Sequence, residues 1–550
     1  MPSGALQQAQ LALEAGDYAS VMRACESALR ADRGSVQAWL GLAVACLKSN
    51  DFRRCAEAAA QLAALAPSHA LAHKISGAAH AGLSDPAASL SSFAVAVSLD
   101  DRDQETQNGV AAALNDLREF RRALAATDAI LRRWPHFAPG HYNRGVALAG
   151  LGRSREAIES YRRAIAHKPD FVEALNNYAV LLAKSGRHIE AIELCDRSLE
   201  IDPGFAPAHA NKGLALVDLG RDAEALAACE TAVALNPRDA ESGLTRAHLL
   251  LATGRVGEGL EGLETRRRFP KWIERRFDFP EWRGGQAAGR KILVWAEQGL
   301  GDTIQFCRYA GVLASRGAEV TLAVQNPLRR LLAGLPNVRV RALDEPPEAH
   351  DLHAPLMSLP HLLGLDEHSL FVEPARLKVA ATRVARWRAK LDPGLFHIGV
   401  AWQGNPAGDV DRGRSFALAA LLPLSRVPGV KLWSLQKNAG VEQLRAIADR
   451  FHVEDPGPDF DAGPDAFLDT AALMASLDLV VTCDTAVAHL AGTLRRPVWV
   501  ALQVASEWRW LREREDSPFY PTARLFRQAR AGDWPELFGR MEQALRQRPG

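Results

Sequence analysis

A repeat of 34 residues runs through the first half of the chain and limits the folds that it can form. The turn of each unit carries a polar or charged residue, and successive turns are always 34 residues apart. These turn residues are Asp17, Asp51, Asp85, Glu119, Arg153, Arg187, Arg221 and Arg255. Units in such strict register predict a solenoid of stacked supersecondary structures, each of which contacts mainly its neighbours.

Further columns of this repeat predict pairs of helices whose backbones approach closely. The residue eight positions before each turn residue is always alanine or glycine, as Ala43 and Gly145 illustrate. The residue just before the turn residue is mostly of a type that tolerates a turn, such as Asn50 or Gly152. Prolines that end the second helix of a pair recur in one register at Pro67, Pro135, Pro169, Pro203 and Pro237.

These columns resemble those of tetratricopeptide repeats over residues 1–266. The resemblance implies helix pairs stacked into a right-handed superhelix, with a concave surface that holds peptides or partner proteins. A purely structural stalk is the alternative interpretation. Four of the five cysteines of this half fall at recurring repeat positions, which predicts core packing rather than metal binding or catalysis. They are Cys25, Cys55, Cys195 and Cys229.

Residues 267–290 interrupt the repeat and are predicted to form an aromatic-rich linker. Pro270, Pro280 and the Gly284-Gly285 pair disfavour a long helix. The aromatic side chains are too many for a free tether, so we expect this stretch to pack between the two halves. They are Phe269, Trp272, Phe277, Phe279 and Trp282.

The remaining chain alternates candidate strands and helices. An apolar strand at 292–295 leads into a glycine-bearing turn at 297–302 and then a helix. Further strand candidates lie at 319–324, 338–342, 397–402, 430–436, 477–483 and 496–502, and the last helix candidate is 534–546. This alternation predicts parallel sheets in two lobes, 291–380 and 381–550. The predicted fold class is therefore an α superhelix followed by an α/β region.

Several stretches of this region resemble the heptosyltransferase-like glycosyltransferases of family 9. They are the Gly-Leu-Gly-Asp turn at 299–302, GVAWQGNP at 399–406, SLQK at 434–437, DTAVAHLAG at 484–492 and RPVWV at 496–500. The resemblance covers about residues 288–548. It implies a GT-B fold, with the first lobe binding the acceptor and the second the nucleotide sugar, and catalysis without a metal.

The whole chain also resembles bacterial proteins that fuse tetratricopeptide repeats to such a domain, some of which glycosylate flagellin. The first lobe is short beside those of lipopolysaccharide heptosyltransferases. A short acceptor lobe next to a repeat superhelix favours a large acceptor, delivered by the repeats, over a lipid.

The resemblance assigns the role of general base to Asp302, which would deprotonate the acceptor hydroxyl as it attacks. The alternative is that Asp302 only caps the helix that begins at Thr303. Glu297 is a second carboxylate on the same turn and could be the base instead.

The second lobe should hold the donor. Ligands of open α/β sheets bind at the carboxyl ends of strands, and a helix that starts there presents free N–H groups to phosphate. Thr485 and Ala486 begin such a helix, whereas Asp484 would bind sugar hydroxyls or cap it. A lone histidine on a helix is usually structural, but the resemblance places His489 near the donor.

Polar residues after two other strands complete the predicted donor site. A guanidinium in the loop after 397–402 could neutralise the leaving phosphate, although a solvated loop is an equal alternative. The predicted residues of that loop are Gln403, Asn405, Arg412, Arg414 and Ser415. Gln436 and Lys437 end the next strand and could reach the nucleotide. Trp508 and Trp510 could stack on the base of the donor, but packing in the core is the favoured interpretation.

Bulk properties exclude several other classes of protein. A net charge of +1 suggests no bulk electrostatic affinity for nucleic acid or membranes. No signal peptide or run of about 18 apolar residues is found, and seven cysteines without a C-x-x-C pair fit a reducing cytoplasm. The D-x-D triplets at 409–411 and 459–461 are interpreted as accidental, and neither a zinc-spaced cluster nor a P-loop motif is present.

The sequence therefore predicts a cytoplasmic, metal-independent glycosyltransferase that needs no cofactor besides its nucleotide-sugar substrate. It would modify Ser or Thr of a protein recruited by the repeats, and the resemblance suggests flagellin. Two alternatives stay open: a non-catalytic repeat scaffold with a degenerate glycosyltransferase domain, and a glycosyltransferase that acts on a glycan.

Overall fold

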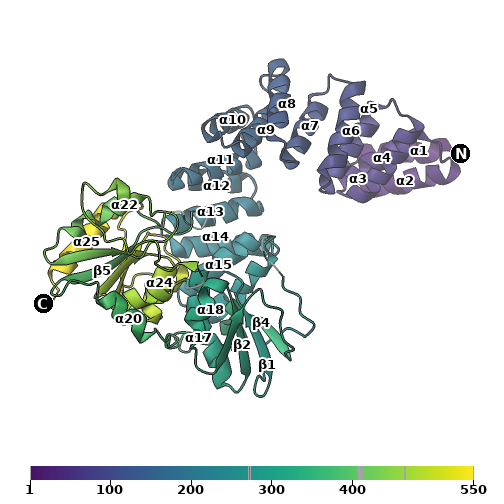
Figure 1. Ribbon diagram of the computed structural model, residues 1–550. Helices are drawn as coiled ribbons and strands as arrows, with labels where there is room; N and C mark the ends of the chain where they lie inside the picture. Colours follow the sequence, from purple (N-terminus) through teal and green to yellow (C-terminus); the bar gives the residue numbers. More distant parts are fainter. Residues whose placement is uncertain are drawn as a thin grey trace. The chain divides into compact units, whose positions relative to one another are not determined.

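The computed structural model describes residues 2–270, 272, 274–406, 411, 413–463 and 466–548. The chain forms two compact units, Met1–Asn211 and Lys212–Gly550. The first is a stack of helices, and the second contains two parallel sheets with their helices (Figure 1). The predicted fold class, an α superhelix followed by an α/β region, is confirmed. No helix within these described ranges is long and apolar enough to span a membrane.

The first unit is built from two helices per 34-residue repeat, joined by short turns (Figure 1). Its helices are α1 (Pro2–Glu14), α2 (Tyr18–Ala31), α3 (Val36–Lys48), α4 (Phe52–Leu65), α5 (Ala70–Gly82), α6 (Pro86–Leu99), α7 (Gln104–Asp116), α8 (Phe120–Arg133), α9 (Ala138–Gly150), α10 (Ser154–His167), α11 (Val172–Lys184) and α12 (His188–Ile201). Helix α13 (Ala206–Asp218) spans the division between the two units.

The predicted turn column adopts the same left-handed backbone in every repeat. Its φ angles are all positive, at Gly16, Asn50, Ser84, Arg118, Gly152, Gly186, Gly220 and Gly254. Glycine adopts this conformation without strain, which explains its frequency in the column. In early repeats the following aspartate caps the next helix, and Asp17 accepts a hydrogen bond from the Ser20 N–H at 3.0 Å.

The small-residue columns allow the two helices of a repeat to touch. A methyl group at Gly145 would lie 2.5 Å from the ring of Tyr161, and one at Gly213 would lie 2.6 Å from the sulfur of Cys229. All seven cysteines are buried and reduced, and burial raises the pKa of the Cys25 thiol to about 11. The cysteines therefore serve as apolar packing groups, as predicted.

The repeat pattern continues into the second unit. Its helices there are α14 (Asp222–Leu235), α15 (Ala240–Ala252) and α16 (Val256–Gly262), followed by the 3₁₀-helix η1 (Leu263–Arg268). Ala247 and Leu251 of α15 share one apolar core with Ile292 and Val294 of the first sheet. These last repeat helices therefore belong to the same compact unit as the sheets, although the repeat pattern itself extends to 266.

The aromatic linker packs on the first sheet. Trp272, Phe277 and Phe279 lie against Leu293 and Trp295. The backbone N–H of Trp282 also donates to the carbonyl of His353 at 2.7 Å, and the His353 N–H donates to the carbonyl of Pro280 at 3.0 Å. This stretch thereby extends the edge of the sheet.

The first lobe contains a four-stranded parallel sheet of order β3-β2-β1-β4 (Figure 1). Its strands are β1 (Lys291–Trp295), β2 (Glu319–Val324), β3 (Val338–Ala342) and β4 (Leu352–Pro355). Its helices are α17 (Leu300–Ser315), α18 (Asn326–Leu332), η2 (Leu356–Ser358) and α19 (Leu359–Leu362).

The second lobe contains a five-stranded parallel sheet of order β6-β5-β7-β8-β9. Its strands are β5 (Phe396–Ala401), β6 (Val430–Ser434), β7 (Leu479–Cys483), β8 (Val498–Leu502) and β9 (Ala523–Arg527). Its helices are α20 (Ala381–Arg388), η4 (Leu418–Leu421), α21 (Leu422–Ser425), α22 (Gln443–Ala446), α23 (Leu468–Met474), α24 (Ala486–Thr493), η6 (Trp508–Trp510) and α25 (Trp534–Arg546). Strand β9 was not predicted, because Arg524 and Arg527 interrupt its apolar residues.

Candidate active site

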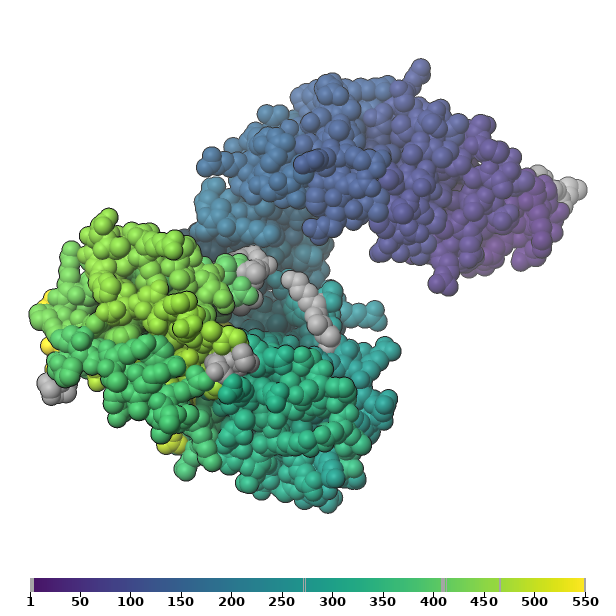
Figure 2. Space-filling view, in the orientation of Figure 1, coloured from purple at the N-terminus to yellow at the C-terminus, as the bar shows by residue number. Residues whose placement is uncertain are grey.

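The two lobes meet where strand β1 and strand β7 are each followed by a helix. The lobes lie side by side in the space-filling view (Figure 2), and one apolar core contains residues of both. A methyl group at Gly301, in the first turn of α17, would lie 3.4 Å from the Cα of Ala486 and 3.0 Å from the ring of His489. Glycine permits this close approach, which brings the N-termini of α17 and α24 together.

Asp302 lies at this junction and is held from both lobes. The Gly299 N–H donates to its Oδ2 at 3.0 Å, and the guanidinium of Arg509, from η6 in the second lobe, donates to its Oδ1. Arg509 is 8% exposed, whereas the Asp302 side chain remains 22% exposed. Burial raises the pKa of Asp302, while the neighbouring Arg509 opposes the rise. Asp302 therefore does bond the start of the helix, and its partial exposure also leaves it able to accept a proton.

Glu297, the second candidate base, is enclosed in a different network. Its side chain is 2% exposed. The guanidinium of Arg266 donates to its Oε1 at 3.0 Å, and the backbone N–H groups of Met357 and Leu356 donate at 3.1 and 3.0 Å. Burial raises its pKa to about 7. This carboxylate ties η1 to η2, so the geometry favours Asp302 over Glu297 as the base.

Charges of both signs surround the start of α24. Burial, reinforced by the carboxylate of Glu507, raises the pKa of Asp484 to about 6, and Arg509 and Arg414 act against the rise. The Thr485 hydroxyl lies 3.3 Å from that of Thr482. Thr485 and Ala486 thus begin a helix next to two arginines, an arrangement suited to an anionic group.

His489 lies one turn into α24 and is buried among aromatic rings. Its Nδ1 is 3.0 Å from the hydroxyl of Tyr520, and its ring stacks on Trp510 with centroids 5.4 Å apart. Burial lowers its pKa well below the usual value, so the ring is neutral at neutral pH. Trp508 and Trp510 are both buried, as predicted.

Several predicted donor residues brace the loops that follow β5 and β6. Gln436 accepts from the N–H groups of Trp402 and Gln403 at 3.0 Å and donates to the carbonyl of Gln403 at 2.9 Å. The side chain of Gln403 accepts from Gln443 at 3.0 Å, and the ammonium of Lys437 donates to the carbonyl of Phe460. These contacts give Gln403, Gln436 and Lys437 a role in shaping the loops.

The loop after β5 carries one predicted residue that borders a cavity. Ser415 accepts from the Gly404 N–H at 2.9 Å, and Arg414 donates to Asp411 at 3.4 Å. Asn405 lies in the same loop, whereas Arg412 lies outside the described residues. Arg414 and Asp484 line a cavity of about 300 Å³ together with Glu507 and Arg512, which follow β8.

Sequence reasoning missed Glu507 and Arg509. Both are charged residues that alternate with two tryptophans after β8, and that alternation was the only local signal. The guanidinium of Arg509 bonds both Glu507 and Asp302, and it lies 5.5 Å from the ring centroid of Phe306. Arg509 therefore links the two lobes at the site.

No group of side chains within the described ranges could hold a metal ion. Asp461 of the second D-x-D triplet instead caps α23, because it accepts from the N–H groups of Asp469 and Thr470 at 2.7 and 3.2 Å. Residues 409 and 410 of the first triplet lie outside the described part of the chain.

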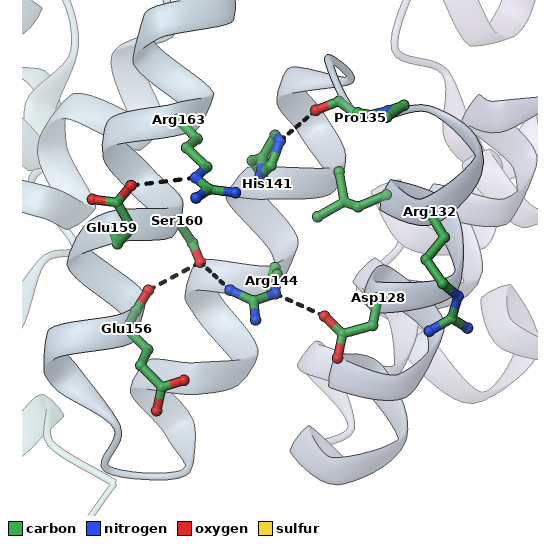
Figure 3. A pocket seen from close by; sticks show the side chains of 10 residues that line it. Asp128, Arg132, Pro135, His141, Arg144, Glu156, Glu159, Ser160 and Arg163 are labelled. Atoms are coloured by element: carbon green, nitrogen blue, oxygen red, sulfur yellow. Dashed lines mark hydrogen bonds and ion pairs between the residues drawn. The ribbon is translucent and has the colours of Figure 1, made fainter.

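A separate pocket of about 470 Å³ lies in the repeats between α8, α9 and α10 (Figure 3). Arg144 at its centre bonds Asp128 at 2.7 Å and the hydroxyl of Ser160 at 2.9 Å, and Arg163 bonds Glu159 at 3.2 Å. The surface of the repeats therefore has a polar hollow that is lined by both carboxylate and guanidinium groups.

Comparison with known proteins identifies the repeats. Two family models, both described as tetratricopeptide repeat, match residues 142–204 and residues 12–78 and 182–249. The N-terminal half is therefore a tetratricopeptide repeat region, a class of structure that binds other proteins.

Protein FlbA of Caulobacter vibrioides (strain ATCC 19089 / CIP 103742 / CB 15) is 29% identical to this chain over 299 residues. The match covers 49% of this chain and 49% of FlbA, so the chain spans about half the length of this curated relative.

Solved structures resemble the repeats more distantly. A tetratricopeptide repeat protein from Parabacteroides merdae ATCC 43184 is 11% identical, with a TM-score of 0.40 over 44% of this chain and 97% of the other. Cut9–Hcn1 of the APC/C is 17% identical, with a TM-score of 0.39 over 49% and 53%. No conclusion about function follows from likenesses this low.

Proposed function

We propose that the chain is a metal-independent glycosyltransferase that moves a sugar from a nucleotide sugar to Ser or Thr of a protein held by its repeats. One observation carries this proposal. Asp302 and the N-terminus of α24 come together at the junction of two parallel-sheet lobes, where Gly301 nearly touches Ala486 and His489. A base and an anion-binding helix terminus in one place are what sugar transfer from a nucleotide sugar requires.

In this mechanism the acceptor hydroxyl attacks the anomeric carbon while the bond from that carbon to the donor phosphate breaks. Asp302 accepts the proton of the hydroxyl, and burial makes it a better proton acceptor by raising its pKa. The leaving nucleotide takes the bonding electrons. Its negative charge is met by the first N–H groups of α24 and by Arg414, which replace the metal ion of other transferases.

Arg509 positions Asp302 in this scheme. Its guanidinium bonds both Asp302 and Glu507, so it fixes the carboxylate relative to the donor lobe. Without this contact the first lobe alone would have to hold the base, through the single bond from the Gly299 N–H.

The repeats would supply the acceptor. Tetratricopeptide repeats bind proteins, and the pocket between α8 and α10 offers charged groups to a bound segment (Figure 3). Flagellin is the acceptor that the family resemblance suggests. The finding that the family models match the repeats supports a protein rather than a glycan as acceptor.

The chemistry is tested by Asp302→Asn. Asparagine can still accept the hydrogen bond from the Gly299 N–H, but it cannot accept a proton. We expect release of nucleotide from the preferred nucleotide sugar to fall by about 10²- to 10⁴-fold, the usual contribution of a general base. The matched control is Asp533→Asn, because Asp533 also bonds the start of a helix, accepting from the Glu536 N–H at 3.2 Å.

The control should retain the wild-type rate. An equal rate for Asp302→Asn and the wild type would leave Asp302 with its helix-capping role only. If the wild type turned over no nucleotide sugar in the presence of a captured protein, the chain would be a repeat scaffold with a degenerate transferase domain.

A further inference from the structure

One column of the repeat changes its chemistry in the last unit. The column is apolar in six successive repeats, at Val44, Ala78, Ala112, Val146, Val180 and Leu214. The next member of the column is His248, on α15. Side chains of this column are half-buried, so they lie at the surface of the stack, and the exchange for histidine changes what α15 presents there.

His248 and Leu214 both line the cavity of about 300 Å³ that Arg414 and Asp484 border. Helix α15 packs against η6, which brings His248 beside the loop that follows β8. The cavity therefore has one wall from the last repeats and one wall from the second lobe. All these residues belong to the second compact unit.

The repeat wall is fixed firmly to the transferase lobe. Arg512 bonds Asp222 of α14 at 2.6 Å, and both side chains are mostly buried. A methyl group at Gly220 would lie 3.3 Å from Val504. Ala247 and Leu251, which flank His248 on α15, are part of the core of the sheets. The wall is thus a permanent part of this unit.

The imidazole of His248 is available to a ligand. No hydrogen bond to this ring is found within the described ranges, and its charged neighbours are Glu507 and Arg509. Burial lowers its pKa, so the ring is neutral and offers one donor and one acceptor. A half-buried ring that lines the cavity and has both capacities unused fits a ligand that carries hydroxyl or amide groups.

The cavity lining also decides which part of a nucleotide sugar it can take. Two carboxylates, Asp484 and Glu507, face two guanidinium groups, those of Arg414 and Arg512, so the charged lining is balanced. Apolar side chains of the repeats, such as Leu214 and Leu249, also line the cavity. A doubly charged diphosphate fits the end near Arg414 and α24, whereas an uncharged nucleoside fits between the repeats and Glu507.

We propose that α13 and α15 form one wall of the donor pocket, and that His248 hydrogen-bonds the nucleoside of the donor. This inference rests on the proposed function and assigns the repeats a second role, selection of the donor nucleotide. It makes the last repeats inseparable from the transferase lobe.

The test measures the affinity of the full chain for UDP, GDP, ADP and CDP by titration calorimetry. His248→Leu restores the residue type of the repeat column and so preserves packing. We expect this variant to bind the preferred diphosphate about 3- to 10-fold more weakly, which is the effect of one hydrogen bond. It should also discriminate less among the four diphosphates. His248→Asn, which keeps a donor and an acceptor, should recover part of the affinity.

Leu214→Trp provides a second, independent probe, because it fills the cavity from α13 and should weaken binding by more than about 10-fold. Val146→Leu, in the same column of the first unit, is the matched control and should bind like the wild type. Thermal unfolding of each variant establishes that it is folded.

The outcomes separate this inference from the proposed function. If the wild type binds a diphosphate and both His248→Leu and Leu214→Trp bind it equally well, the repeat wall is not part of the donor pocket. If the wild type binds none of the four diphosphates, the proposed function fails, and this inference fails with it.

Discussion

The first unit and the second unit differ in the distance along the chain over which their contacts form. Buried side chains of the repeats fall into small separate clusters, each drawn from neighbouring helices. In the second unit one cluster runs from Ala247 to Leu525 and includes both lobes. Repeat stability is approximately a sum of local terms, whereas a continuous core unfolds as a whole. A substitution should therefore act locally in the first unit and throughout the second.

The largest effect is expected for Glu297→Ala in the second unit. It removes one of the two carboxylates that bond Arg266, which is 3% exposed, and it leaves the N–H groups of Leu356 and Met357 unpaired. Loss of one partner of a buried ion pair should destabilise this unit by about 3–5 kcal/mol. Hydrogen exchange should rise in both sheets together and stay unchanged in residues 1–211. Faster exchange confined to the first lobe would contradict the continuous core.

The contributions of Glu297 and Glu156 to the pH dependence of stability should have opposite signs. Burial raises the pKa of Glu297 to about 7 from an ordinary value of 4.5. Between these values the folded state binds more protons, so the contribution of Glu297 to stability is present below 4.5 and is lost as the pH rises to about 7. Glu297→Gln, which resembles the protonated form, should remove this slope.

Glu156 in the repeats provides the contrast. Its hydrogen bond with Arg153 lowers the pKa of Glu156, so its contribution is present above the ordinary value of 4.5 and is lost as the pH falls. Amide hydrogen exchange reports the unfolding of each unit separately. Repeating it across this pH range would measure how the stability contributions of both residues change with pH. If the contributions of Glu297 and Glu156 had the same sign, this assignment would be contradicted.

A smaller and local effect is expected for Gly145→Val in the first unit. The new side chain would meet the ring of Tyr161, since even a methyl group there lies 2.5 Å from it. Overpacking of this kind costs about 1–3 kcal/mol. Exchange should rise in α9, α10 and their neighbours, but not in the sheets. The control is Gly4→Val, because no atom lies within 4 Å of a methyl group at Gly4.

The smallest effect is expected for Arg187→Ala. Arg187 pairs with Glu190 on the surface, in an arrangement that recurs as Arg153–Glu156, Arg221–Glu224 and Arg255–Glu258. Exposed pairs contribute no more than about 1 kcal/mol, so the unfolding free energy should hardly change. A loss above 2 kcal/mol would mean that this recurring pair stabilises the superhelix more than an ordinary surface pair does.

The same contrast explains what the sequence could predict. In the repeats, local patterns were sufficient: the predicted turn column has a positive φ in every unit. Strands β2 and β3 and helix α25 also lie where their apolar patterns indicate. Strand β9 was missed because charged residues alternate with its apolar ones.

The candidate site could be predicted only in part. Asp302 and α24 each follow a strand, a local signal, but the ion pair between Asp302 and Arg509 joins residues 207 positions apart. No local sequence pattern at either residue predicts the other as its partner. Gln403 and Gln436 were predicted as donor ligands from their places after strands. The Gln436 side chain instead bonds the backbone of Gln403, and the Gln403 side chain accepts from Gln443. His248 could have been found, because it follows six successive apolar members of its column.

The central claim is tested most directly by the intact mass of proteins that this chain captures from its source cells. Captured protein from cells with the wild type is compared with that from cells with Asp302→Asn. The account predicts sugar-sized mass increments on the captured protein with the wild type only, and equal capture by both. Identical masses in both samples would contradict it, because Asp302 would then contribute nothing to modification of the bound protein.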